Sequence, residues 1–572
     1  MKVNFQKAFV SGVERIAAWA DLLDAINVFP VADGDTGRNL IISLTPLRKL
    51  DHNSEKIIKK LLLSARGNSG IIAARFFSGF LTADSLEKIP QAVKLGRDLA
   101  WKAVREPQKG TMLTVFDTLV EITGKKSIEA NPESISGLID HLQKSVYSTT
   151  DHLPRLKEAG VVDAGALGMF IYLEGFFNSL IGNVNRFLPL TSIFKNRLKI
   201  SASFEEGKQK HYCIDTVIRS GDDIEEQIKS LSELGDSVVV IPDNDILKIH
   251  LHSDDKELVR KKVESFGSLI QWSDEDLENQ IQNFKLNQKE QAIHIMTDAA
   301  GSVTREDSVN LGMTLLDSYI TAGEESMPET FFNPSDLYSM MKSGAKTSTS
   351  QASEFERHQY YQSALDQYGN VLYLCVGSFY TGNYDIAIDW KGKNDPENRF
   401  SVIDTGAASG RLGILAIATA IYSSKTDDPE RVIKFAETAV SICREYIFID
   451  RLKYLAQGGR MSKTSAFFGD VLHMKPVITP TPEGAKKIGL VRNPDDQIKL
   501  IFEKLDESID KKSSALIMVE YTDNREWVSE KVKSKIEKDY PASTVLLRPL
   551  SLTSGVHTGP GTWAVAFIPE TV

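Results

Sequence analysis

Two carboxylates separated by a single glycine stand in a stretch that cannot continue as a helix. Asp33 and Asp35 flank Gly34 within the sequence NVFPVADGDTGRN, residues 27–39. Glycine costs about 1 kcal/mol in a helix interior and aspartate favours caps and turns, so the stretch predicts a sharp acidic turn. Neighbouring carboxylates repel each other, and a hard divalent cation such as Mg²⁺ would offset that repulsion and bring nucleotide phosphates with it. The alternative is an ordinary solvated Asp-Gly turn.

A second stretch has the composition of a phosphate site. Arg66-Gly67-Asn68-Ser69-Gly70 stands directly before an apolar segment, 71–80, that reads as a helix. Backbone N–H groups at the start of a helix attract anions, and small residues let a phosphate approach closely. Gly67, Asn68 and Ser69 are therefore predicted to hold phosphate, although the same string also suits a plain helix cap.

The two stretches resemble the metal loop and the nucleotide site of the DhaL-type dihydroxyacetone kinase domain, in the version found in fatty acid kinases. The resemblance extends in order to a stretch from Arg105 to Met112 and to residues 160–166, GVVDAGA. Ala32 and Arg38 depart from the proline and the threonine expected in the metal loop. Neither would be a metal ligand, and Arg38 could alter phosphate contacts.

This resemblance assigns roles to individual residues. It implies that Asp33 and Asp35 are catalytic and bind Mg²⁺, with Asn27 as a weaker third candidate. Ordinary turns between helices remain the alternative for the segments around Gly110 and Asp163. The residues expected to contact ATP are Thr36, Asn39, Gly67, Asn68, Ser69, Gly110, Thr111, Met112 and Asp163.

Two histidines alternate with apolar residues along a predicted strand, 246–252. His250 and His252 share one face with Lys248, and residues at i and i+2 of a strand lie about 6–7 Å apart at their Cα atoms. That spacing suits a shared Zn²⁺, with Cys213 as a third ligand. Solvated histidines on a polar strand face are the alternative. The cysteine and the His-x-His pair resemble the middle domain of the large chain of fatty acid kinase, which favours zinc in either a structural or a catalytic role.

Four stretches of the C-terminal half resemble the DegV family of fatty-acid-binding proteins. They are TDA at 297–299, TSQAS at 349–353, GGRMSKT at 458–464 and HTGPG at 557–561, and TGNY at 381–384 replaces the family's Ser-Gly-Thr-Tyr turn. Ala299 and Ala352 replace a usual serine and proline. Arginine and histidinium oppose the charge of an acyl carboxylate, and hydroxyl and N–H groups donate hydrogen bonds to it. The resemblance implies a head-group site formed by Thr349, Ser350, Thr381, Gly382, Arg460, His557 and Thr558.

Hydrophobic patterns predict the elements that must position these residues. Residues 1–195 read as helices at 57–65, 90–103, 132–147 and 151–159, with the glycine motifs between helices. Residues 196–285 have the strand and helix order of a ferredoxin-like module, including a helix at 223–234. Residues 286–572 alternate strands and helices, which predicts a largely parallel sheet with ligand sites after the strands. The predicted fold is multidomain: an all-α DhaL-type helical barrel, a small α+β ferredoxin-like middle module and an α/β DegV-like C-terminal domain.

Composition excludes several classes of protein. A chain of 572 residues is too long for one core and predicts two to four domains. The net charge of −10 argues against a nucleic-acid partner. Three scattered cysteines exclude a disulfide framework and suit a reducing compartment. No apolar run approaches the roughly 18 residues that a membrane span needs, and the first residues do not read as a signal peptide, so a cytoplasmic location is expected.

Together the motifs predict a fatty acid kinase that converts ATP and a fatty acid into acyl phosphate and ADP. A fatty acid carboxylate, with a pKa of about 4–5, is ionised at neutral pH and needs no general base. Catalysis then depends on positioning two anions and stabilising the transferring phosphoryl group. The rivals are a small-ketone (glycerone) kinase, whose separate histidine-bearing substrate protein is not found in this sequence, and a lipid sensor with a vestigial kinase domain. The expected partners are a fatty acid, a membrane acyltransferase that uses acyl phosphate, and a second copy of the chain in a homodimer.

Overall fold

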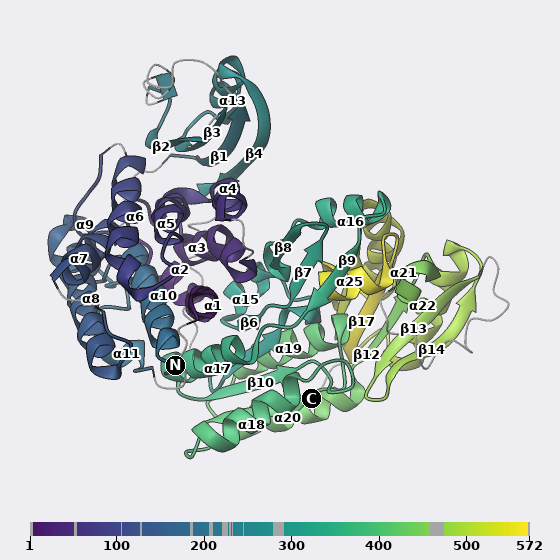
Figure 1. Ribbon diagram of the computed structural model, residues 1–572. Helices are drawn as coiled ribbons and strands as arrows, with labels where there is room; N and C mark the ends of the chain where they lie inside the picture. The colour runs from purple at the N-terminus through teal and green to yellow at the C-terminus, as the bar shows by residue number, and fades with distance from the viewer. Residues whose placement is uncertain are drawn as a thin grey trace. The chain divides into compact units, whose positions relative to one another are not determined.

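The chain forms two compact units, Met1–Lys285 and Leu286–Val572 (Figure 1). The computed structural model describes all residues except 1–3, 51–53, 105, 126–127, 184–186, 205–209, 220–226, 228–229, 232, 244, 278–290, 458–473 and 570–572. Among the described helices, none combines the length and the hydrophobicity that crossing a bilayer requires.

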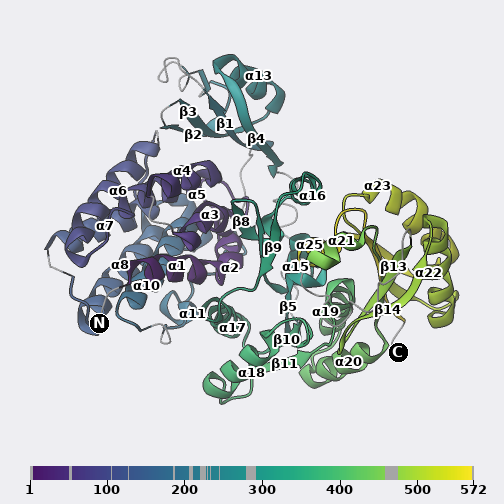
Figure 2. The same ribbon diagram turned by 45° about the vertical axis from the view of Figure 1, so that its right-hand side comes forward.

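The first unit begins with a helical bundle. Amphipathic helices surround α10 (Ala164–Leu180), which packs against α1, α7 and α8 (Figure 2). The sequence of α10, AGALGMFIYLEGFFNSL, is apolar on all sides, as expected of a helix buried in a core. The other helices are α1 (Phe5–Ala17), α2 (Ala20–Ala25), α3 (Thr36–Leu44), α4 (Ser54–Ser64), α5 (Gly67–Phe80), α6 (Ile89–Ala103), α7 (Met112–Lys125), α8 (Pro132–His152), α9 (Pro154–Ala159) and α11 (Leu190–Ile193), with short 3₁₀ helices at Thr45–Lys49 and Leu86–Lys88.

A buried ion pair crosses the centre of this bundle. The Arg15 side chain on α1 donates from Nε to the Glu174 carboxylate on α10 at 2.9 Å, and Nη2 contacts the same oxygen. Arg15 is 1% and Glu174 is 4% exposed. The guanidinium also lies 3.8 Å from the centroid of the Phe187 ring. The pair therefore fixes α1 against α10 with two charges that water cannot reach.

The first unit also contains a four-stranded antiparallel sheet in the order β2-β3-β1-β4. Its strands are β1 (Tyr212–Arg219), β2 (Asp236–Asp243), β3 (Ile246–Ser253) and β4 (Ser268–Asp276), and α13 (Lys256–Phe266) packs on β1 and β4. This order agrees with the predicted ferredoxin-like module. The predicted helix at 223–234 falls largely outside the described residues. The sequence prediction did not include β4, whose segment SLIQWSDED ends in charged residues that obscure a strand pattern.

The second unit contains three sheets. The first, β11-β10-β5-β6, is parallel, the three-stranded sheet β8-β7-β9 is antiparallel, and the third has the order β14-β13-β12-β17-β15-β16. In the third sheet only the β15–β16 pair is parallel among the described strands. The expectation of a largely parallel sheet is therefore right for the first sheet and wrong for the third, because β17 returns the C-terminal segment between β12 and β15.

One helix joins the parallel sheet to the six-stranded sheet. The apolar α19 (Ser409–Ser423) packs against β5 and β10 on one side and against β15 and β17 on the other (Figure 2). The strands are β5 (His294–Asp298), β6 (Thr314–Leu316), β7 (Tyr319–Ala322), β8 (Glu325–Pro328), β9 (Thr347–Ser350), β10 (Val371–Cys375), β11 (Phe400–Asp404), β12 (Arg444–Phe448), β13 (Lys475–Thr481), β14 (Gly484–Val491), β15 (Ala515–Tyr521), β16 (Thr544–Pro549) and β17 (Trp563–Pro569). The remaining helices are α15 (Arg305–Leu311), α16 (Pro334–Lys342), α17 (Glu354–Tyr368), α18 (Asn383–Asn394), α20 (Pro429–Ile442), α21 (Leu452–Gln457), α22 (Pro494–Ser508), α23 (Arg525–Val528), α24 (Ser534–Asp539) and α25 (Leu552–Thr558), with a π-helix at Ser529–Lys533 and 3₁₀ helices at Ala299–Gly301 and Glu329–Phe331.

Candidate functional site

The acidic loop ends at the first residue of α3. Asp35 occupies the N-cap position, yet its side chain makes no capping hydrogen bond. Asp24, on α2, takes that role: its Oδ1 accepts from the backbone N–H of Gly37 at 2.6 Å and of Arg38 at 3.2 Å. Gly34 has a φ of +65°, a conformation that favours glycine. The Asp35 carboxylate is thus left available for a ligand, and no pattern in the sequence indicates the part that Asp24 plays.

The two loop carboxylates are buried rather than solvated. Asp33 and Asp35 are each 8% exposed, which excludes the simple surface turn. Burial, and then the charge of Asp35, raise the pKa of Asp33 well above its usual value. Burial also raises the pKa of Asp35, against the opposing effect of Arg38. Asn27 Nδ2 donates to Asp33 Oδ1 at 2.5 Å. Two buried acidic groups that disfavour each other's charge form a donor set that a hard divalent cation fits.

The predicted phosphate cradle forms the first turn of α5, which begins at Gly67 rather than at residue 71. Gly67 has a φ of +57°, and a Cβ atom there would lie 2.2 Å from Asn39 Nδ2. A Cβ atom on Gly70 would lie 2.0 Å from Ser43 Oγ. Both glycines therefore allow α5 to pack closely on α3. Asn39 supports this turn from within the bundle.

A single cavity of about 440 Å³ brings the loop and the cradle together. The bundle side of its wall includes the predicted residues Asn27, Asp33, Asp35, Thr36, Gly67, Asn68, Ser69, Thr111, Met112 and Asp163. Of the predicted nucleotide contacts, Asn39 and Gly110 do not line it. The opposite wall comes from the four-stranded sheet and includes Asp236, Ser237, Val238, Val239, His250 and His252. Apart from the two histidines, this second wall was not anticipated, because no sequence pattern marks which edge of a sheet faces a neighbouring bundle.

The segments around Gly110 and Asp163 begin two helices beside the cavity. Gly110 precedes α7 with a φ of +89° and donates its N–H to Thr114 Oγ1 at 2.8 Å. Asp163 is the N-cap of α10, where its Oδ1 accepts from Ala166 N at 2.7 Å. Burial raises the pKa of Asp163 to about 7. Arg105 lies outside the described residues. These segments are helix caps that also lie beside the cavity.

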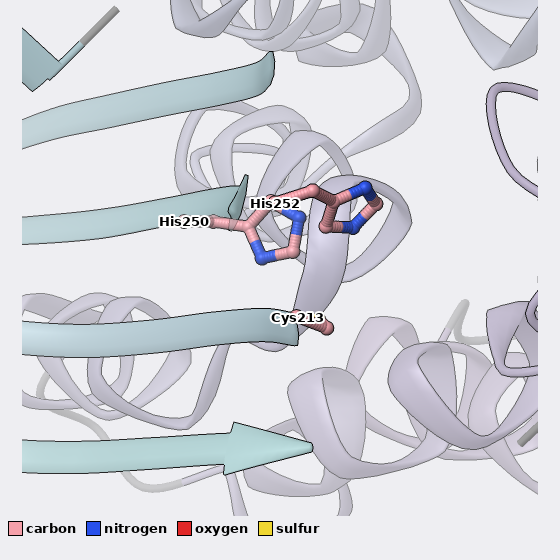
Figure 3. A group of neighbouring side chains, drawn as sticks. All are labelled: Cys213, His250 and His252. Carbon is pink, nitrogen blue, oxygen red and sulfur yellow. The ribbon is translucent and has the colours of Figure 1, made fainter. Parts of the chain in front are cut away.

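Cys213, His250 and His252 come together on neighbouring strands (Figure 3). Cys213 lies directly opposite His252 in the β1–β3 pairing, and the candidate ligand atoms of all three residues are within 4.8 Å of one another. All three side chains are buried. Burial lowers the pKa of His252 to about 3 and raises that of the Cys213 thiol. Neither ring nitrogen of His250 has a hydrogen-bond partner among the described residues. Buried imidazole and thiol ligands with unused donor atoms fit Zn²⁺.

In the second unit, two residues of the predicted head-group site meet. Thr349 Oγ1 on β9 lies 3.2 Å from His557 Nε2 on α25. Ser350 is exposed at the end of β9, and Thr558 Oγ1 donates within α25 to the carbonyl of Ser554 at 2.9 Å. Arg460, with the whole 458–464 stretch, lies outside the described residues.

Thr381 and Gly382 stand at the start of α18, where Asp298 organises the chain. Asp298, at the end of β5, is 2% exposed and accepts from Tyr373 Oη at 2.9 Å, Val376 N at 2.8 Å and Asn383 Nδ2 at 2.9 Å. Thr381 Oγ1 accepts from Asn383 N at 3.2 Å. The carboxylate therefore fixes the turn that carries Thr381 and Gly382. The sequence marked Asp298 as part of a motif but did not reveal this connection.

Comparison with known proteins divides the chain in the same way. Three family models match it: the DAK2 domain over residues 30–178, the FakA-like middle domain of fatty acid kinase over 209–284, and the DegV family of uncharacterised proteins over 292–570. The cavity lies within the region of the first two matches, and the Thr349–His557 pair lies within the third. The recognition of all three domains from sequence motifs is therefore confirmed.

Individual relatives match part of their length. An uncharacterized protein of Staphylococcus haemolyticus is 30% identical over 344 residues, which are 54% of this chain and 61% of the relative. Protein YloV of Bacillus subtilis is 30% identical over 310 residues, 48% of this chain and 55% of the relative. The chain thus spans a little over half the length of these relatives.

Two solved structures resemble the C-terminal half. A DegV family protein from Thermus thermophilus, described as fatty acid binding, is 21% identical with a TM-score of 0.45 and covers 49% of this chain and 99% of its own. DegV of Bacillus subtilis, a fatty acid binding protein, is 22% identical with a TM-score of 0.45 and covers 49% of this chain and 100% of its own. From the family matches, the chain is a fatty acid kinase-like fusion in which a DAK2 domain, a FakA-like middle domain and a DegV domain follow one another.

Proposed function

We propose that this chain is a fatty acid kinase, which transfers the γ-phosphoryl group of ATP to the carboxylate of a fatty acid and releases acyl phosphate and ADP. The observation that carries the proposal is the cavity in which two buried carboxylates face the first turn of α5. A cation site beside a helix N-terminus suits a metal-bound nucleotide. The DegV domain on the same chain supports a fatty acid as the acceptor.

The nucleotide site assigns a role to each group. Asp33, Asp35 and Asn27 would hold Mg²⁺, which neutralises phosphate charge during phosphoryl transfer. Asn68 and Ser69 would hold phosphate through the N–H groups of the first turn of α5. Burial keeps bulk water away from the two carboxylates, which strengthens their electrostatic interaction with a cation. The protein's contribution is then to position two anions and stabilise the transferring charge, without a general base.

The acyl carboxylate would be held in the second unit. Thr349 and His557 already lie within hydrogen-bond distance of each other, so a carboxylate placed beside them could accept from both. Thr381, held by the Asp298 network, and Arg460 complete the set that the DegV resemblance implies. In the kinase systems that the sequence resembles, the acyl-binding protein is a separate chain, so this chain would carry both functions.

The purified full-length chain is therefore expected to make acyl phosphate from ATP, Mg²⁺ and free fatty acid with no added binding protein. Trapping with hydroxylamine would convert the labile product to a hydroxamate that is readily measured. The tether should raise the effective concentration of the acyl group toward the millimolar range. Residues 1–285 and 286–572 made as separate chains should react more slowly when dilute. If hydroxamate forms only after a separate acyl-binding protein is added, the DegV domain is not the donor; fatty acid binding without any ATP turnover would favour a lipid sensor.

Zinc in the middle module is the second part of the proposal. Cys213, His250 and His252 would hold one Zn²⁺ per chain, through a thiolate and two imidazoles. Metal analysis of protein purified without chelator should find about one zinc per chain. The double variant His250→Ala/His252→Ala should contain none, while His141→Ala, at an exposed position on α8, should keep it. Wild-type protein free of zinc would refute the assignment.

A further inference from the structure

Asp215 lies between the Cys213–His250–His252 cluster and the first turn of α5. It is two residues after Cys213 on β1, opposite His250 in the β1–β3 pairing, and is 6% exposed. Its Oδ2 accepts from the backbone N–H of Gly67 at 3.2 Å. Its Oδ1 lies 3.4 Å from Nδ1 of His250 and 3.8 Å from Nζ of Lys248. One carboxylate therefore reaches a candidate metal ligand with one oxygen and the phosphate cradle with the other.

We propose that Asp215 is a positioning residue that couples metal binding at Cys213, His250 and His252 to phosphate binding at the start of α5. The inference rests on the proposed function for the identity of both sites. It adds a connection between them that neither the sequence motifs nor the family matches contain. The connection is short, because a single buried side chain spans it.

The metal side of the argument concerns the orientation of His250. A histidine that binds a metal through one nitrogen commonly donates the other N–H to a carboxylate, which fixes the tautomer and the ring orientation. Nδ1 of His250 faces Asp215, so Nε2 is the nitrogen available to a metal. His250 is 1% exposed, and neither of its nitrogens has a hydrogen-bond partner within the described part of the chain. Asp215 is the carboxylate placed to orient this ring.

The phosphate side concerns charge and the direction of N–H groups. Asp215 already holds the N–H of Gly67, which leaves the next N–H groups of α5, those of Asn68 and Ser69, to a phosphate. Its negative charge opposes an anion at the cradle. A divalent cation on one thiolate and two neutral imidazoles adds net positive charge beside Asp215 and offsets that repulsion. Zinc is therefore expected to tighten phosphate binding.

The test measures both ligands on the full-length chain. Zinc affinity is obtained by competition with a chromophoric chelator, and the affinity for a non-hydrolysable ATP analogue with Mg²⁺ by calorimetry, on zinc-loaded and zinc-stripped protein. In the wild type, zinc should tighten analogue binding, and the analogue should tighten zinc binding by the same factor, because coupling between two binding sites is reciprocal. Asp215→Asn should weaken zinc binding by about 10–100-fold and abolish this coupling.

The control is Asp254→Asn, the same chemical change on an exposed side chain of the same module that pairs with Lys210. It should leave zinc affinity and coupling unchanged. The inference is overturned if Asp215→Asn binds zinc as tightly as the wild type, if zinc does not alter analogue binding, or if the wild type binds no zinc. Analogue binding without coupling would refute this inference alone, whereas zinc-loaded protein that binds no analogue would refute the proposed kinase function as well.

Discussion

Asp35→Asn and Asp33→Asn are each expected to reduce acyl phosphate formation by about 10²–10³-fold or more, because each removes one charge of a preorganised site that acts on the transferring phosphoryl group. Both carboxylates are buried in the wall of the cavity, so water cannot replace the lost oxygen charge at low cost. Hydroxamate formation and ATP turnover measure the effect. Raising Mg²⁺ should restore part of the activity only if the loss is one of metal affinity.

The same substitutions should leave the helical bundle folded. Asp24, rather than Asp35, caps α3, so the helix keeps its N-terminal hydrogen bonds in Asp35→Asn. Removing one of two buried carboxylates that repel each other also relieves an unfavourable interaction in the metal-free protein. Thermal unfolding should therefore occur at the same or a higher temperature. Asp84→Asn, at an exposed carboxylate paired with Lys88, is the matched control for activity. Wild-type turnover in both loop variants would remove Asp33 and Asp35 from the metal site.

Glu174→Ala is expected to destabilise the first unit by about 3–5 kcal/mol, the usual cost of removing one partner of a buried ion pair. The substitution leaves the Arg15 guanidinium, which is 1% exposed, in the centre of the bundle without its carboxylate. Denaturant unfolding followed by far-ultraviolet circular dichroism would measure the loss as a lower midpoint at an unchanged slope.

Replacing both partners tests the cause of that loss. Arg15→Met with Glu174→Leu removes both charges and keeps apolar volume, so the double variant should be much more stable than Glu174→Ala. A Glu174→Ala protein that loses less than about 1 kcal/mol would mean that water reaches the pair, in the range measured for exposed pairs.

The local chemistry of the site was more predictable from the sequence than its walls. The Asp33-Gly-Asp35 turn and the His250-x-His252 alternation are set by neighbours in the chain, because a turn depends on a few residues and a strand has a fixed period of two. Asp24 and Asp215 carry no such signal. Each acts on a residue that the fold brings close, 13 positions away for Asp24 and Gly37 and 148 positions away for Asp215 and Gly67.

The three domain types were predicted correctly, and the order of the middle sheet followed from its elements. The mixed six-stranded sheet of the second unit did not. Strand direction there depends on where β17 inserts, and pairing across such separations is decided by packing rather than by the local pattern of any one strand. The missing strand β4 has the same origin, because its apolar residues are few and its neighbour β1 supplies the pairing.

The direct pairing of Cys213 with His252 has a consequence for how the middle sheet forms. A slip of β1 against β3 by one residue would turn Cys213 to the opposite face of the sheet, and a slip by two would move it about 6–7 Å along the strand. Only the native alignment therefore brings the thiol and the imidazoles to one point. An ion bound there would stabilise that alignment and none of its neighbours, so it would select the correct strand register during folding.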